Sequence, residues 1–175
     1  MVAAPVPART PAGSHVVHTL AVGFADLCGF TRLGRSLPEH ELVRIVERFE
    51  GAALLALPAS GATVVKLLGD GVLFHAEDVG TAVDAAASLV HEALADGSLP
   101  AVRAAVTFGR VVMRGGDCFG ETVNRASRLL DVAPPGTVVA DEAAVDTCDD
   151  AYPWLSLGRP QLRDYGPWGV WAAVA

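Results

Sequence analysis

A hairpin pattern in the first half of the chain constrains the fold more than any other feature. Residues 62–76, ATVVKLLGDGVLFHA, form two apolar runs on either side of Gly69-Asp70-Gly71. Glycine on both sides of an aspartate favours a tight turn, and apolar runs that flank such a turn indicate paired strands. The pattern therefore predicts a hairpin of two antiparallel strands.

Two helices and a strand are predicted around this hairpin. Residues 16–26, VVHTLAVGFAD, are apolar and β-branched, which is typical of a buried strand. Residues 36–57 predict a helix in which Ser36 and Glu39 form a capping box, and residues 78–97 predict a second helix. Apolar residues recur at helical spacing in both, at Leu42, Ile45, Val46, Phe49 and Ala53, and at Val79, Ala82, Val83, Ala86, Leu89, Val90 and Ala93.

The second half of the chain predicts shorter elements. Residues 101–113 indicate a strand that bends at Gly109, and residues 120–133 a short helix. Its core face is predicted at Val123, Ala126 and Leu130. Residues 134–141 predict a turn into a strand, and residues 159–174 a closing hairpin.

The order of these elements predicts an α+β fold. Strand, helix, strand, strand, helix, strand is the β-α-β-β-α-β order of ferredoxin-like folds, here with additional C-terminal elements. We expect one domain over residues 16–175, with helices mainly on one face of the sheet. A bare opposite face usually recruits a partner or a second copy. Residues 1–15 contain three prolines and are predicted to form a flexible tail.

Composition excludes several classes of protein. The net charge of -7 disfavours a general nucleic-acid binder, which is expected to be basic. No apolar run approaches the roughly 18 residues of a membrane span, so no membrane partner is expected. Cys28, Cys118 and Cys148 show no zinc or disulfide spacing. They are interpreted as reduced thiols of a cytoplasmic protein.

Two aspartates are candidate metal ligands. Asp26 ends the first strand and Asp70 lies at the hairpin tip, and each is surrounded by apolar sequence. An ionised carboxylate in such a place needs a partner or a metal. In a ferredoxin-like sheet the two come close, and paired carboxylates suit hard divalent cations that act on phosphates. Simple turn or capping roles remain open for both residues.

The turn after Asp26 is a candidate phosphate-binding site. In the segment LCGFT, Gly29 permits a tight turn whose backbone N–H groups face phosphates. Leu27 is assigned to the metal site, and Phe30 and Thr31 to substrate binding. The chain contains no P-loop motif.

Two further pairs suggest nucleotide chemistry. Asn124 and Arg128 lie four residues apart on one helix face, where the arginine could oppose a phosphoryl group. A solvated surface is the alternative. Lys66 interrupts an apolar strand, and Asp117 precedes the short helix. Lysine only donates and an ionised aspartate only accepts, so together they match the edge of adenine and oppose that of guanine.

Three motifs resemble those of a known family. FADLCGFT, KLLGDGV and GDCFGETVNRASR closely resemble the motifs of class III nucleotidyl cyclases, the adenylyl and guanylyl cyclase catalytic domains. The resemblance extends from about His18 to Trp171. It implies that Asp26 and Asp70 bind two divalent cations, Mg²⁺ or Mn²⁺, and that Lys66 and Asp117 select adenine.

The same resemblance implies the remaining roles. Asn124 orients the ribose, and Arg128 stabilises the transition state at the α-phosphate. It also implies a homodimer with shared sites and the conversion of ATP to cyclic AMP and pyrophosphate. The family often has Leu-Lys-Gly near the C-terminus, where this chain has Leu162-Arg163-Asp164. Arg163 is a candidate for the triphosphate, and a solvated arginine is the alternative.

The same motifs bear on three other functions. A diguanylate cyclase is disfavoured because GGDCF differs from G-G-D-E-F at Cys118 and follows the second long helix, whereas the predicted hairpin contains LLGDGV. A guanylyl cyclase is disfavoured because Lys66 opposes guanine. A nucleotide-binding or dimerisation domain without turnover stays open. Such a domain would, however, be expected to have lost at least one of the six side chains to which the resemblance gives a role, which are Asp26, Asp70, Lys66, Asp117, Asn124 and Arg128.

Overall fold

The computed structural model describes residues 15–148 and 152–174. Residues 1–14 of the predicted tail therefore lie outside the described part of the chain. The described elements are β1 (Val16–Leu27), α1 (Phe30–Leu33), α2 (Glu39–Ala59), β2 (Thr63–Leu67), β3 (Gly71–Ala76), α3 (Val79–Ala95), β4 (Val102–Arg114), β5 (Asp117–Phe119), α4 (Glu121–Asp131), β6 (Val138–Asp141), α5 (Glu142–Thr147), β7 (Trp154–Ser156), β8 (Gln161–Leu162), β9 (Gly166–Pro167) and β10 (Val170–Ala173).

The main sheet has the predicted ferredoxin-like core. Its strands follow the order β2-β3-β1-β4-β6-β10-β7, and β5 pairs with β4. The β2–β3 hairpin forms as predicted, and β1 lies between β3 and β4, antiparallel to both. Strand β6 then adds parallel to β4, and β10 adds antiparallel to β6. The first strand therefore lies beside the hairpin, as the two-carboxylate site requires.

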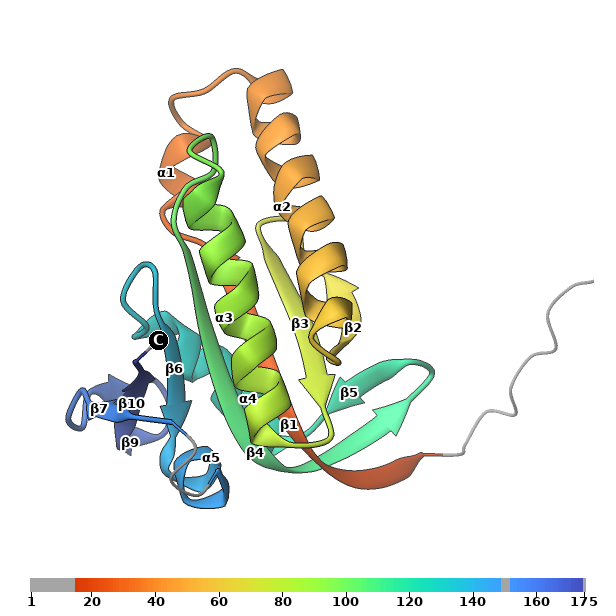
Figure 1. Ribbon diagram of the computed structural model, residues 1–175, viewed down its shortest axis with the longest axis vertical. Coiled ribbons are helices and arrows are strands. Elements are labelled where there is room, and N and C mark those ends of the chain that lie inside the picture. Colours follow the sequence, from red (N-terminus) through yellow and green to blue (C-terminus); the bar gives the residue numbers. More distant parts are fainter. Residues whose placement is uncertain (1–14, 149–151, 175) are drawn as a thin grey trace, which may run out of the picture.

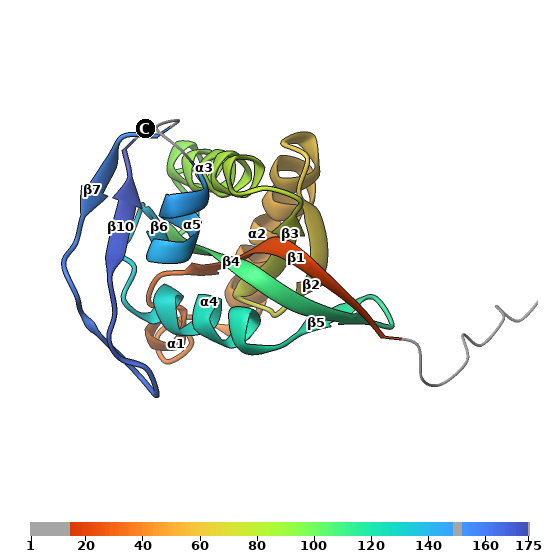
Figure 2. The same cartoon turned by 90° about the horizontal axis from the view of Figure 1, so that it is seen from below.

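Helices cover both faces of the sheet to different extents. Helices α2 and α3 lie together on one face, and α4 lies on the other (Figures 1 and 2). All seven apolar positions predicted for the stripe of α3 are buried. On the opposite face, Ala126 of α4 packs with Leu20, Val22, Leu73 and Val111 of the sheet. The prediction of helices mainly on one face is therefore correct for the long helices α2 and α3, but it did not include α4 on the opposite face.

Three details differ from the sequence-based expectations. The capping box is wrong because α2 begins at Glu39 with Pro38 as its N-cap, and the Ser36 hydroxyl donates to Leu33 O at 3.2 Å instead. The C-terminal hairpin is reduced to the short pair β8–β9, since β10 joins the main sheet. Strand β7, which pairs with β10, was not predicted.

A two-stranded arm projects from the sheet. Strand β4 extends beyond the core and turns back as β5, so that both strands protrude with the start of β1 (Figure 1). At its base Gly109 approaches α4 closely, because an added Cβ would lie 2.7 Å from the Thr122 hydroxyl oxygen. Phe119, the last residue of β5, is 48% exposed, and Val16, the first residue of β1, is 54% exposed. An apolar arm of this kind is typical of a surface that meets another chain.

Candidate active site

The structure brings the two predicted metal-binding aspartates together. Asp26 is paired with Gly71 in the β1–β3 ladder, and the Leu27 N–H donates to Asp70 O at 2.8 Å. Glycine suits position 71, because an added Cβ would lie 3.1 Å from Ala25 O. The end of β1 and the hairpin tip are therefore fixed against each other by backbone contacts.

Arg103 is a site residue that the sequence interpretation missed. From β4, its Nε donates to Asp26 Oδ1 at 2.7 Å and its Nη2 donates to Asp26 Oδ2 at 3.1 Å. Its Nη1 also donates to Asp131 O, at the end of α4, at 3.2 Å. The sequence did contain a signal for Arg103, because this cation interrupts the apolar run VRAAV in the same way as Lys66 interrupts its apolar strand.

The electrostatics of this cluster favour a bound cation. Partial burial raises the pKa of Asp70, and the nearby charge of Asp26 raises it further. The hydrogen bonds to Asp26 raise the pKa of Arg103, so the guanidinium stays charged. The two carboxylates thus carry more negative charge than one arginine neutralises.

The donor set fits Mg²⁺ or Mn²⁺. The described part of the chain holds no group of three or more His, Cys, Asp or Glu side chains that could enclose a metal. One or two carboxylates completed by substrate phosphates and water are the usual ligands of Mg²⁺. Asp26 and Asp70 therefore match a metal that is held jointly with a nucleotide.

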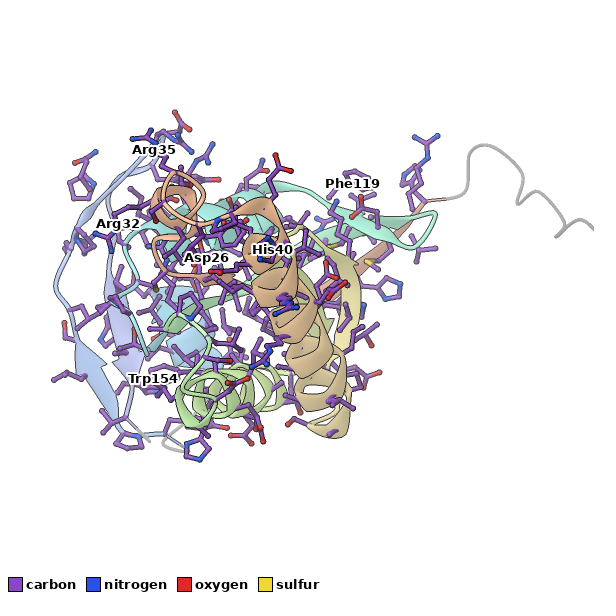
Figure 3. The ribbon with its side chains drawn as sticks, turned by 90° about the horizontal axis from the view of Figure 1, so that it is seen from above. Asp26, Arg32, Arg35, His40, Phe119 and Trp154 are labelled. Atoms are coloured by element: carbon purple, nitrogen blue, oxygen red, sulfur yellow. The ribbon has the colours of Figure 1, made fainter. Side chains whose placement is uncertain are left out.

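The turn after β1 leads into a single-turn helix. Gly29 has φ 74°, a conformation that favours glycine, and it precedes α1. Phe30 and Thr31 are the first residues of α1, where backbone N–H groups have no partner within the helix. The Leu27 side chain is buried and its N–H is used by Asp70, so any contribution to a metal comes from its carbonyl oxygen. In Figure 3 Asp26 lies near the middle of the molecule, far from Phe119 on the arm.

Lys66 and Asp117 meet although they lie far apart in the sequence. Lys66 Nζ donates to Asp117 Oδ1 at 2.9 Å and to Oδ2 at 2.6 Å. The hydrogen bonds from Lys66 hold the pKa of Asp117 below its usual range. Both side chains keep part of their surface exposed, 42% and 31%, so a ligand can reach them.

Helix α4 presents Asn124 and Arg128 on its accessible side. Asn124 is exposed, and Arg128 keeps 28% of its side chain exposed. The predicted core face was incomplete, since Thr122, Arg125 and Leu129 are buried with Ala126 and Leu130, whereas Val123 is only partly buried.

Buried Arg125 anchors α4 to the sheet. Its Nε donates to Asp141 Oδ2 at 2.5 Å, its Nη1 to both oxygens of Glu121, and its Nη2 to Phe108 O at 3.0 Å. Trp168 lies over the guanidinium, 5.8 Å from its carbon to the ring centroid. These contacts set the rotation of the helix and thereby the direction in which Asn124 and Arg128 point.

Arg163 lies near the end of α4 and not beside Arg128. Its Nη2 is 3.7 Å from Asp131 Oδ2, and its side chain is 66% exposed. The neighbouring Asp164 is the residue that approaches Arg128, with Oδ2 3.4 Å from Nε. No hydrogen bond or ion pair in the described residues connects the Lys66–Asp117 pair with the Asp26–Asp70–Arg103 cluster.

Curated relatives are similar in sequence to most of this chain. The chain is 49% identical over 124 residues, 71% of its length, to an adenylate cyclase of Streptomyces coelicolor. It is 49% identical over 122 residues to an adenylate cyclase of Streptomyces griseus. It is 36% identical over 149 residues to a pH-sensitive adenylate cyclase of Mycobacterium tuberculosis. No protein-family model matches the chain.

Solved structures show the same fold. A rhodopsin-guanylyl cyclase catalytic core with converted specificity, in complex with ATPαS, superimposes with a TM-score of 0.84 at 18% identity, over 93% of this chain and 99% of that one. The adenylyl cyclase CyaB from P. aeruginosa superimposes with a TM-score of 0.77 at 20% identity, over 93% and 96%. A non-canonical dimeric guanylyl cyclase domain of a fusion protein from Blastocladiella emersonii superimposes with a TM-score of 0.77 at 16% identity, over 93% of this chain and 99% of that one.

This chain belongs to the class III nucleotidyl cyclase family. The chain spans about a third of the curated relatives it matches, 32% and 31% of the two Streptomyces proteins. In the part of the chain that the structure describes, none of the helices has the length and apolar character needed to cross a membrane.

Proposed function

We propose that this domain is an adenylate cyclase, which converts ATP to 3′,5′-cyclic AMP and pyrophosphate. The observation that carries the proposal is the pairing of Lys66 with Asp117, 51 residues apart, within 2.6 Å and in reach of solvent. The relatives at 49% identity, which are named adenylate cyclases, support the same substrate.

The Lys66–Asp117 pair supplies the chemistry that selects adenine. Adenine offers an acceptor at N1 and donors at N6. Lys66 has three N–H donors, so it can keep one bond to Asp117 and donate another to N1. Asp117, whose lowered pKa keeps it ionised, accepts from the amino group. Guanine would place its O6 acceptor against Asp117 and its N1–H donor against Lys66, and both contacts are repulsive.

Asp26 and Asp70 are proposed to hold two divalent cations, Mg²⁺ or Mn²⁺, together with the phosphates. When bound, such ions would activate the ribose 3′-OH and neutralise the triphosphate. Arg103 has two effects in this cluster. It keeps both oxygens of Asp26 oriented. It would also add a permanent positive charge near the phosphates of a nucleotide bound at this cluster. The first turn of α1, with the N–H groups of Phe30 and Thr31, is proposed to bind phosphate oxygens as well.

Helix α4 is proposed to act on the sugar and the α-phosphate. Asn124 would hydrogen-bond the ribose and so aim its 3′-OH at the α-phosphorus. Arg128 would stabilise the charge that grows on the α-phosphate as pyrophosphate leaves. No protein nucleophile is required, so most of the rate enhancement comes from positioning and charge stabilisation.

We propose that each site is shared between two copies of the chain. One protomer supplies Asp26 and Asp70, and the other supplies the Lys66–Asp117 pair, Asn124 and Arg128. The exposed apolar residues of the projecting arm support an interface there. Since this chain carries all six groups, a symmetric pair would contain two complete sites.

Nucleotide turnover is the direct test. Purified protein is incubated with ATP or GTP and with Mg²⁺ or Mn²⁺, and cyclic nucleotide and pyrophosphate are both quantified. Cyclic AMP and pyrophosphate in equal amounts from ATP, with little cyclic GMP, is the expected result. Absence of both products at high protein concentration and with both metals would rule out the proposal. The Asp70→Asn variant provides the background rate.

A further inference from the structure

The turn between β8 and β9 contains an aspartate in an unusual backbone conformation. Asp164 has φ 72° and is the one non-glycine residue with a positive φ among the described residues. Aspartate tolerates this left-handed conformation better than most residues, although glycine adopts it without strain. Its side chain is 68% exposed, so burial does not explain its position.

The Asp164 carboxylate lies against the arginine that we assign to the α-phosphate. Its Oδ2 is 3.4 Å from Arg128 Nε. The adjacent cation, Arg163, is held 3.7 Å from Asp131 Oδ2. The turn therefore presents a negative charge to Arg128, where a triphosphate would be helped by a positive one.

We propose that Asp164 is a further residue of the nucleotide site, which competes with the phosphates of ATP for Arg128. In the nucleotide-free site the carboxylate pairs with the guanidinium. Phosphate oxygens displace it when ATP binds, and it returns to Arg128 once cyclic AMP, which keeps the α-phosphate, has left. Asp164 thus sets how tightly the nucleotide is held, and it does not take part in bond making. This inference rests on the proposed function of Arg128.

The two partners differ in how easily they can move. Arg128 projects from α4, which buried Arg125 fixes to the sheet. Asp164 lies on an exposed turn, and no other hydrogen bond or ion pair of its side chain is found in the part of the chain that the structure describes. An exposed ion pair is weak, whereas a guanidinium binds phosphate through stronger charge-assisted bonds. Displacement of the carboxylate by a triphosphate is therefore favourable.

The test compares two substitutions with a control of equal charge change. Asp164→Asn keeps the shape and removes the charge, and Asp164→Gly removes the side chain at a φ that glycine prefers. The control is Asp146→Asn, a charge removed from an exposed position on α5. The measurements are kcat and KM for ATP, and the Kd of 3′-deoxy-ATP, which lacks the attacking hydroxyl, by calorimetry with Mn²⁺.

Both Asp164 variants are expected to lower KM and Kd by about three- to fivefold, the range of an exposed ion pair, without raising kcat. The control should change neither constant. In an Arg128→Ala background the Asp164 substitutions should have no further effect, because the contested cation is gone.

Several outcomes would overturn the inference. They are unchanged binding in both variants, weaker binding, a fall in kcat at constant KM, or an equal effect in the Arg128→Ala background. The analogue separates this inference from the proposed function. If Asp164→Asn tightens 3′-deoxy-ATP but no cyclic AMP forms from ATP, the cyclase proposal fails and the competition stands. If cyclic AMP forms and binding is unchanged, the competition fails alone.

Discussion

Lys66 and Asp117 form a bidentate hydrogen-bonded pair, in which the Lys66 ammonium lies 2.9 Å and 2.6 Å from the two Asp117 oxygens. Lys66 comes from β2, the outer strand of the β2–β3 hairpin, and Asp117 from β5 on the projecting arm. Because the arm folds back along β4, β5 reaches the edge strand β2. The arm thus has two consequences: it exposes apolar surface, and it completes the pair assigned to the base.

Reversal of this pair should change the nucleotide preference. Lys66→Glu accepts from guanine N1–H, and Asp117→Ser removes the carboxylate that would repel O6. The double variant is expected to lose about 100-fold in kcat/KM for ATP, the size of two lost hydrogen bonds to a base, and to gain measurable GTP turnover. Rates with both nucleotides under matched conditions provide the measurement. An unchanged preference for ATP in a folded double variant would remove the role assigned to the pair.

Much of the fold was readable from the sequence because its signals are local. The hairpin at Gly69-Asp70-Gly71 and the apolar stripe of α3 are each contained within about 20 residues. The failed capping box shows the limit of such signals. Ser36 and Glu39 have the correct spacing, but the Ser36 hydroxyl closes the turn after α1. Pro38, in an extended conformation, is the N-cap of α2 instead.

The site was readable from the sequence where a residue type was out of place and a partner of matching chemistry could be named. Lys66 and Asp117 met both conditions as a donor and an acceptor, although they lie 51 residues apart. Arg103 interrupts an apolar run as Lys66 does, but nothing in the sequence pairs it with Asp26, and Arg125 occupies an ordinary position for an arginine on a short helix. A sequence pattern marks Arg125 as one more charge on a short helix, and only the fold buries it against Asp141.

The Arg103–Asp26 pair predicts competition between a cation and the metal. Arg103 donates to both oxygens of Asp26, so its positive charge opposes a divalent ion that binds the same carboxylate. Arg103→Met should lower the half-saturating Mn²⁺ concentration by about two- to fivefold, the range of a partly exposed ion pair. It should also reduce kcat, because a positive charge near the phosphates is lost. Metal titrations at saturating ATP separate the two effects, and a higher Mn²⁺ requirement would contradict the first.

Asp70 should set the acid limit of metal binding. Its pKa is raised by burial and by Asp26, so it takes up a proton at a higher pH than an ordinary aspartate. As the pH falls through this raised pKa, a proton replaces the metal, and the half-saturating Mn²⁺ concentration should rise. Asp117, whose pKa is lowered, stays ionised over the same range. Metal titrations at successive pH values test this expectation.

The raised pKa of Asp70 also means that its charge destabilises the metal-free fold at neutral pH. A carboxyl whose folded-state pKa is raised costs stability at pH values above that pKa, and the cost disappears as the pH falls below the unfolded value. Asp70→Asn should therefore raise the thermal midpoint of the metal-free protein at neutral pH while it abolishes turnover. A lower midpoint would show that the Asp70 charge is stabilising in the fold.

The buried Arg125–Asp141 pair should dominate the stability of the α4 face. Arg125→Met leaves Asp141 fully buried without its cation. The substitution is expected to lower the free energy of unfolding by about 3–5 kcal/mol. Glu121→Gln is the matched control, because Glu121 is 62% exposed and its bond to Arg125 should contribute less than about 1 kcal/mol. Urea unfolding at neutral pH gives both values. Similar costs for the two variants would show that Arg125 is not the anchor.

Shared sites predict that two inactive variants restore each other. Asp26→Ala removes a metal ligand and leaves α4 intact, whereas Arg128→Ala leaves the carboxylates intact. A mixed dimer therefore contains one site with both defects and one site with none. If protomers exchange freely, half of the dimers in an equal mixture are mixed, and each has one of two sites intact. Activity should reach about one quarter of the wild-type value per chain. Differently tagged chains, purified in sequence, isolate the mixed dimer and should show about one half. An inactive, correctly folded mixed dimer would place all six groups of a working site in a single chain.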